Sequence, residues 1–233
     1  MTLLLHQLRF ERMLFRRNPS AAFFNFILPL VLLLLVASVF ADDGDELDLL
    51  IPGIAGMSIM ATTFTALAFN VTFLREQGIL KRMRGTPMPP RDYLGALVGS
   101  AVINAVVQVV LVFAIGKLAY GVDLPDEPFA VLVYAVVGVA AFAALGIALA
   151  HAIPNFDAAG AYTNAVFLPV IFISGVFYSV DDLPRVLEVI GAALPLRHVI
   201  DGLAGDGSGA GLAVVVAWGI LGAILAVRYF RWE

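Results

Sequence analysis

Six stretches of the sequence carry no charged residue and are long enough to cross a lipid bilayer. A hydrocarbon core of about 30 Å requires about 20 apolar residues in a helix, and these stretches contain 21 to 24 residues each. Because backbone amides inside lipid must bond within the chain, we predict that each stretch is a helix. The predicted spans are Ala21–Ala41, Ile51–Leu74, Tyr93–Gly116, Phe129–Ala150, Ala158–Val180 and Gly207–Val227.

Composition supports the same class of protein. Hydrophobic residues make up 61% of the 233 residues and charged residues only 14%, whereas soluble domains usually contain about 45–50% apolar residues. We therefore predict an all-α polytopic membrane protein, with a single transmembrane domain over residues 1–233. The absence of cysteine excludes disulfides, thiolate metal sites and thiol catalysis.

The first apolar stretch has to be distinguished from a signal peptide. Four arginines precede it, and Val39-Phe40-Ala41 is similar to a signal-peptidase site. A signal peptide has an apolar region of only about 7–15 residues, whereas this stretch has 21. We interpret it as a helix that is retained.

The positions of the charged residues predict how the spans are oriented. With the amino terminus in the cytoplasm, 11 of the 14 basic residues lie in cytoplasmic segments and 13 of the 18 acidic residues lie outside, as the positive-inside rule describes. Both termini are therefore predicted to be cytoplasmic, and residues 75–92 to form the main cytoplasmic loop of a multi-pass cell-membrane protein. Residues 1–20 mix Leu, Phe and Arg, which favours a helix along the cytoplasmic interface.

The segment 181–206, between the last two spans, is too apolar for an ordinary solvated loop. Asp181 or Asp182 can cap a helix that has Pro184 in its first turn. Pro195 ends this helix, and a second short helix follows. We predict a pair of re-entrant helices in the outer leaflet, and an amphipathic surface hairpin is the alternative.

The sequence lacks the motif of an ATP-binding motor. A phosphate-binding loop requires the pattern GxxxxGK[ST], but the only Gly-Lys pair, Gly116-Lys117, is followed by Leu118 and lacks the first glycine. The three histidines lie in different segments without the spacing of metal ligands, so no metal site is predicted. We therefore expect this chain to have no enzymatic activity and no cofactor of its own.

Two other classes of membrane protein are alternatives. A nucleotide-independent secondary transporter usually places ionisable residues near the bilayer midplane, and none of the six spans contains one in its interior. Ion sites made of backbone and hydroxyl oxygens need no ionisable residue, so this absence does not exclude them. A lipid-modifying enzyme would need the acidic run at 42–46 and the pair Asp181-Asp182 to bind a magnesium diphosphate, but both clusters are predicted to face outward.

Neutral polar and aromatic residues inside the spans are candidates for a substrate path. Asn104 and Gln108 share one face of the third span, and Thr63 and Asn70 share a face of the second. Interhelical hydrogen bonds explain such polar residues equally well, and contact with lipid explains the aromatic ones. The candidate residues are Phe26, Thr63, Asn70, Asn104, Gln108, Asn164 and Phe167.

Three stretches resemble the type-2 ATP-binding-cassette (ABC) exporter permeases. Residues 75–94, REQGILKRMRGTPMPPRDYL, are similar to the cytoplasmic loop after span two of that family, which has an acidic residue and a glycine, a basic hydrophobic helix and then Thr-Pro. Residues 173–203 are similar to the family's end of span five and its paired re-entrant helices, and the N-terminal segment to its interfacial helix. The resemblance covers essentially the whole chain.

This resemblance implies a half-transporter. Its expected partners are two ABC ATPase subunits, which bind ATP and Mg, a second permease copy, identical or paralogous, and the lipid bilayer, with no nucleic acid. The loop after span two would pass closure of the ATPases to the membrane, with its apolar residues in a groove of the partner and its charges setting the orientation. The implied coupling residues are Arg75, Glu76, Gly78, Leu80, Arg82, Met83, Thr86 and Pro87.

The sequence therefore predicts the permease subunit of an ABC exporter that moves an amphipathic drug, lipid or glycan outward, as in antibiotic resistance by efflux. Amphipathic cargo is favoured because the spans offer aromatic and neutral polar groups in place of charges. A nucleotide-independent secondary transporter is the main alternative, and a membrane-bound lipid-modifying enzyme is the third.

Overall fold

The computed structural model describes residues 2–39, 44–85, 89–180 and 183–229. The secondary structure of these residues is helical and contains no strand. The α-helices are α1 (Thr2–Arg16), α2 (Pro19–Ala22), α3 (Leu28–Val39), α4 (Gly44–Met60), α5 (Ala66–Glu76), α6 (Ile79–Arg84), α7 (Pro90–Tyr120), α8 (Pro128–Ala150), α9 (Phe156–Ile173), α10 (Arg185–Ala193), α11 (Pro195–Ala204) and α12 (Gly209–Tyr229). Two π-helical segments, η1 (Phe23–Ile27) and η2 (Ala61–Thr65), lie between α2 and α3 and between α4 and α5.

Five helices are long and apolar enough to cross a membrane, which makes the chain a multi-pass membrane protein. They are Glu46–Glu76, Asp92–Tyr120, Pro128–Ala150, Phe156–Ile173 and Gly209–Tyr229. They correspond to the last five predicted spans. The first predicted span is helical from Pro19 to Val39, but its apolar part, Asn25–Val39, is shorter than the other five.

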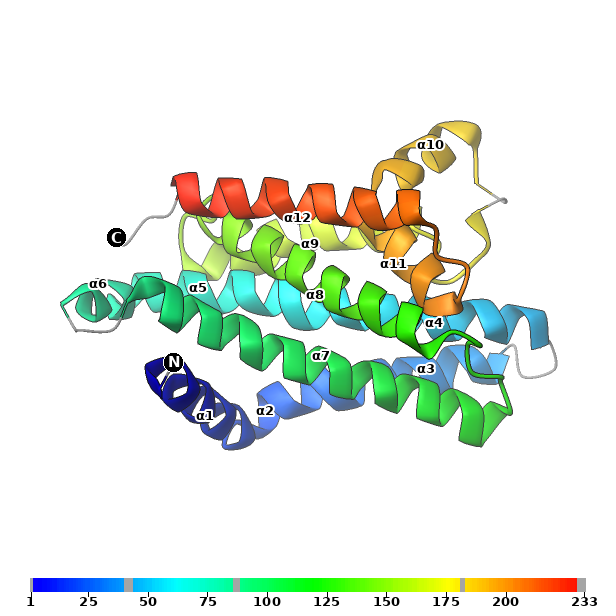
Figure 1. Cartoon of the computed structure of the whole chain (residues 1–233), viewed down its shortest axis with the longest axis horizontal. Coiled ribbons are helices and arrows are strands. Elements are labelled where there is room, and N and C mark those ends of the chain that lie inside the picture. Colours follow the sequence, from blue (N-terminus) through cyan, green and yellow to red (C-terminus); the bar gives the residue numbers. More distant parts are fainter. Residues whose placement is uncertain (1, 40–43, 86–88, 181–182, 230–233) are drawn as a thin grey trace.

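The two ends of the bundle carry opposite charge. α1, α6 and the carboxyl end of α12 lie at one end (Figure 1), and these elements contain Arg9, Arg16, Arg82 and Arg228. The start of α4 and the turn between α7 and α8 lie at the other end (Figure 1), and they are acidic. The folded chain therefore keeps the separation of charge on which the predicted orientation rests.

The continuous helix α4–η2–α5 forms the centre of the bundle, and its side chains are the most buried of the five long helices. α8 packs closely against it because Gly146 leaves no side chain at the crossing. A Cβ atom on Gly146 would lie only 2.4 Å from the carbonyl oxygen of Phe64. On another face of α8, Gly222 of α12 approaches Leu145 in the same way. The small residues of α8 therefore serve packing within one chain.

The helix pair between α9 and α12 agrees with the predicted pair in its bounds. α10 follows Pro184. α11 begins at Pro195 and ends at Ala204, just before Gly205, whose φ of 99° is left-handed. The predicted caps Asp181 and Asp182 lie outside the described residues. α11 packs between α4, α8 and α12, and its residues Leu196, Val199 and Leu203 are fully buried. The chain therefore turns back into the bundle at this end, as Figure 1 shows.

The predicted carboxyl end of the fifth span was wrong. The sequence predicted a helix to Val180, whereas α9 ends at Ile173. Gly175 has a φ of 74°, a left-handed conformation that ends a right-handed helix. Apolar composition alone does not reveal this stop, because residues 174–180 are apolar enough to continue a span.

Candidate functional site

The polar loop after span two folds as a short helix between two turns. α5 ends at Glu76, and Gly78 turns the chain with a left-handed φ of 64° before α6 begins. A Cβ atom on Gly78 would meet nothing within 4 Å, so the turn and not close packing requires glycine here. Pro90 is the first residue of α7. The predicted short helix is present, and Thr86 and Pro87 lie outside the described residues.

Arg75, at the end of α5, closes the carboxyl end of α8. Its guanidinium donates hydrogen bonds to the carbonyl oxygens of Ala150, at 2.9 Å, and of Ile153 and Pro154. The last carbonyls of a helix have no partner within the helix and carry partial negative charge. A cation with several donors in a fixed fork satisfies them well. Arg75 therefore joins the loop after span two to the loop between α8 and α9.

Glu76 makes the complementary contact with the start of α9. Its carboxylate accepts a hydrogen bond from the backbone N–H of Phe156, the first residue of that helix. A carboxylate at this position also interacts favourably with the positive end of the helix dipole. The rings of Phe69 and Phe73 contact the Phe156 ring edge to face. We call Arg75 and Glu76, with these backbone partners, the Arg75–Glu76 link.

The structure changes the expected role of Leu80. The sequence predicted that this side chain enters a groove of a partner, but Leu80 is 0% exposed. It lies in a core cluster with Leu74, Tyr93 and Ile147. Lys81 and Arg82 are exposed on the same short helix, and Arg82 donates to the carbonyl of Gln77. Leu80 therefore anchors α6 to the bundle, and the exposed side of α6 is the surface that a partner can touch.

A cavity of 730 Å³ lies between α1, η1, η2–α5 and the first half of α7. Asn70 and Asn104, two of the predicted path residues, line it. Aromatic rings make up much of the remaining wall, among them Phe69, Phe73 and Phe156. The polar groups of the wall are Gln7, Glu11, Asn18, Asn25, Thr62, Asn70, Tyr93, Ser100 and Asn104. The cavity thus combines the two side-chain types that an amphipathic molecule requires.

The other predicted path residues do not line this cavity. The Thr63 hydroxyl is buried and donates to the carbonyl of Ile59 in its own helix. Asn164 is exposed on α9, and Phe167 is partly buried against the main core. Phe26 packs edge to face on Phe15 of α1. The face shared by Thr63 and Asn70 in the sequence is therefore not a continuous path.

Gln108, the seventh predicted path residue, is fully buried in α7. Neither its amide nitrogen nor its amide oxygen has a hydrogen-bond partner among the described residues. A buried amide without partners costs about 1–3 kcal/mol. We expect Gln108→Met to raise the free energy of unfolding by a similar amount, measured as a higher thermal midpoint of the purified protein in detergent.

Thr72→Val is the matched control for this experiment. The Thr72 hydroxyl is equally buried, but it donates to the carbonyl of Ala68 at 2.7 Å. Its replacement removes a satisfied group, and we expect no gain in the thermal midpoint. A lower midpoint for Gln108→Met than for the wild type would show that the amide has a partner, and Gln108 would return to the list of path residues.

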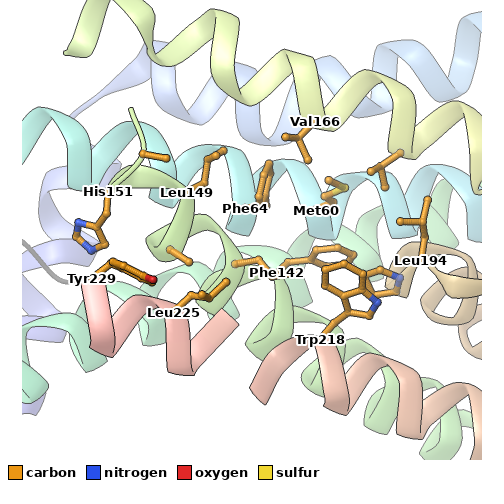
Figure 2. Close-up of a pocket in the computed structure, with 15 residues that line it drawn as sticks. Met60, Phe64, Phe142, Leu149, His151, Val166, Leu194, Trp218, Leu225 and Tyr229 are labelled. Atoms are coloured by element: carbon orange, nitrogen blue, oxygen red, sulfur yellow. The ribbon is translucent and has the colours of Figure 1, made fainter. Parts of the chain in front are cut away.

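A second hollow is a groove of 470 Å³ between η2, α8, α9 and α12, which sequence reasoning missed. Figure 2 shows His151 and Tyr229 at one end, Trp218 and Leu194 at the other, and Phe64 between them. Its wall is almost wholly apolar. The residues come from elements far apart in the sequence, and most of them taken alone are typical of a lipid-facing position. No local signal could have identified the groove.

Comparison with known proteins gives matches over most of the chain and over a part of it. The family model described as "ABC-2 type transporter" matches residues 2–205. The daunorubicin resistance ABC transporter permease protein DrrB1 of Streptomyces coeruleorubidus is 26% identical over 240 residues, which cover 94% of this chain and 82% of that protein. Nodulation protein J of Rhizobium leguminosarum bv. viciae is 40% identical to this chain, and that of bv. trifolii is 38% identical. Each of these matches extends over 73 residues, which cover 31% of this chain and 28% of the relative.

Proposed function

Because the chain belongs to the ABC-2 type transporter family, we propose that it is the permease subunit of an exporter driven by separate ATPase subunits. The observation that carries this proposal is the extent of the family match, residues 2–205, which runs from α1 through α11. The match therefore includes the loop after span two, the Arg75–Glu76 link and the 730 Å³ cavity.

The proposed architecture has six spans with both termini in the cytoplasm, and two permease copies on two ATPases. The segregation of charge between the two ends of the bundle supports this orientation. The exposed surface of α6, with Arg82, lies at the basic end and is available to a soluble partner. The faces of α9 and α12 are mostly exposed in the single chain, which leaves room for lipid or a second copy.

The Arg75–Glu76 link supports a route by which such a partner acts on the membrane helices. A displacement of α6 moves the end of α5, and the link attaches that end to the carboxyl end of α8 and to the start of α9. A displacement of α6 is thus passed to three long helices, α5, α8 and α9. In this proposal Arg75 and Glu76 transmit the motion within the permease, and residues on the outer side of α6 receive it.

An amphipathic drug is the cargo class that we propose. The cavity with amide and aromatic groups supports it, and so does the similarity over 94% of the chain to a relative named for daunorubicin resistance. The nodulation proteins match over only 28% of their length and do not bear on the cargo.

The experiment is transport in inside-out vesicles that contain the permease and its ATPase, with daunorubicin as the first probe. We expect uptake that requires ATP and Mg and is lost with an ATPase variant unable to hydrolyse ATP. A proton gradient without ATP should give no uptake above that of matched vesicles without the permease, which accumulate this weak base passively. Gradient-driven uptake that depends on the permease would instead establish a secondary transporter.

A further inference from the structure

Glu11 of α1 is a carboxylate that faces the 730 Å³ cavity and has no basic partner among the residues that the structure describes. Its side chain accepts one hydrogen bond, at 2.8 Å, from Gln7. No ion pair of Glu11 occurs in the described part of the chain, and no Lys, Arg or His lines the cavity there. A carboxylate removed from water normally requires a cation or several donors. Among the described residues, the charge of Glu11 is therefore compensated by one hydrogen bond from a neutral donor and by no ion pair.

The surroundings of Glu11 are consistent with partial loss of water. Burial raises the pKa of this carboxyl, and the hydrogen bond from Gln7 opposes the rise. The adjacent Arg12 makes no ion pair with Glu11 in the described part of the chain; its guanidinium donates to Asn104 and lies 5.9 Å from the centre of the Phe15 ring. Arg12 lines a different hollow, between α1 and Ile103 of α7.

The rest of the wall suits the body of an organic cation. Phe10, Phe15, Phe69 and Phe73 line the same cavity as Glu11. Aromatic rings attract cations through their negative faces and bury apolar groups at the same time. A metal ion would need more charged ligands, and the described ranges contain no group of three or more acidic or histidine residues arranged to hold a metal ion.

Both π-helical segments border the cavity, through Asn25 of η1 and Thr62 of η2. A π-helical turn widens a helix and leaves its local backbone less regular, and such turns occur frequently at functional sites. The cavity is thus bordered by several elements far apart in the sequence, α1, η1, η2–α5 and α7 among them, and is not a gap beside a single side chain.

We propose that this cavity binds lipophilic organic monocations, with Glu11 as the counter-charge and the phenylalanine rings around the apolar body. The inference rests on the proposed function only where it calls the bound molecule a cargo. Binding itself requires neither ATP nor a partner subunit. It can therefore be tested on the purified chain, and its failure is distinguishable from failure of ATP-driven transport.

The test is equilibrium binding of radiolabelled tetraphenylphosphonium to the full chain in nanodiscs of zwitterionic lipid. Glu11→Gln should weaken binding about tenfold, as expected for loss of one partly buried charge, and Glu11→Asp should retain most of it. Glu188→Gln is the matched control, because Glu188 is an exposed carboxylate on α10, away from the cavity. Tetraphenylborate, which has the same shape and the opposite charge, should not bind at this site when it is measured in a separate experiment.

A second variant keeps the proposal testable should Glu11→Gln fail to fold. Asn70→Asp is nearly isosteric, adds a carboxylate to the same cavity, and should tighten binding of tetraphenylphosphonium several-fold. The proposal is overturned by equal affinity in the wild type and Glu11→Gln, by equal weakening in Glu188→Gln, or by tetraphenylborate binding at the same site. Unchanged affinity in Asn70→Asp together with a misfolded Glu11→Gln overturns it as well.

Discussion

Replacing Arg75 with alanine is expected to uncouple ATP hydrolysis from transport while leaving the protein in the membrane. The guanidinium holds three carbonyl oxygens at the end of α8 and just beyond it. Hydrogen bonds from a charged group contribute about 1.5–3 kcal/mol. Loss of the Arg75 contacts should therefore lower the equilibrium constant for formation of the link by tenfold or more. The expected result is a fall of about tenfold in ATP-driven transport, with basal ATP hydrolysis maintained.

Two controls separate this effect from a general loss of positive charge. Arg17→Ala removes an exposed arginine from the same basic end and should leave transport unchanged. Arg75→Lys keeps the charge but not the fork of donors, and we expect intermediate transport.

Hydrogen exchange provides a readout that needs no partner. The amide of Phe156 is donated to Glu76, and both Arg75→Ala and Glu76→Gln should increase exchange over residues 151–156. Full transport together with unchanged exchange in Arg75→Ala would show that Arg75 is not needed to hold the link, and the prediction would be wrong.

Local signals were sufficient to predict most of the helices. Apolar length predicted the last five spans, and Pro184 and Pro195 marked the helix pair before α12. These features act on their own segment, through the fixed φ of proline or the cost of an unpaired amide in lipid. The end of α9 was missed because the left-handed turn at Gly175 has no distinctive neighbours in the sequence.

The candidate site was predictable only where residues near in sequence define it. The turn at Gly78 and the short helix after it follow from the glycine and proline residues of one loop. The partners of Arg75 lie 75 to 79 residues away, and no pattern in the loop indicates them. Glu11 was hidden for the same reason, since the cavity that it faces is assembled from α1, α5 and α7.

Leu80→Asp is expected to have the largest effect on folding of any change in the loop after span two. Leu80 is fully buried against Leu74, Tyr93 and Ile147. Truncation of such a leucine to alanine costs about 2–5 kcal/mol, and a carboxylate in its place adds the cost of burying a charge without a partner. We expect a sharp fall in monodisperse protein on gel filtration and a lower thermal midpoint for the material that remains.

Arg82→Asp places the same carboxylate on the exposed side of the same helix. Its thermal midpoint should match the wild type, while stimulation of the partner ATPase should fall, because the new charge lies on the surface available for docking. The pair of variants therefore assigns anchoring and docking to opposite sides of α6. Should Leu80→Asp instead remain as stable as the wild type and lose only ATPase stimulation, Leu80 contacts the partner directly, as the sequence first predicted, and α6 must leave the core cluster when the ATPase binds.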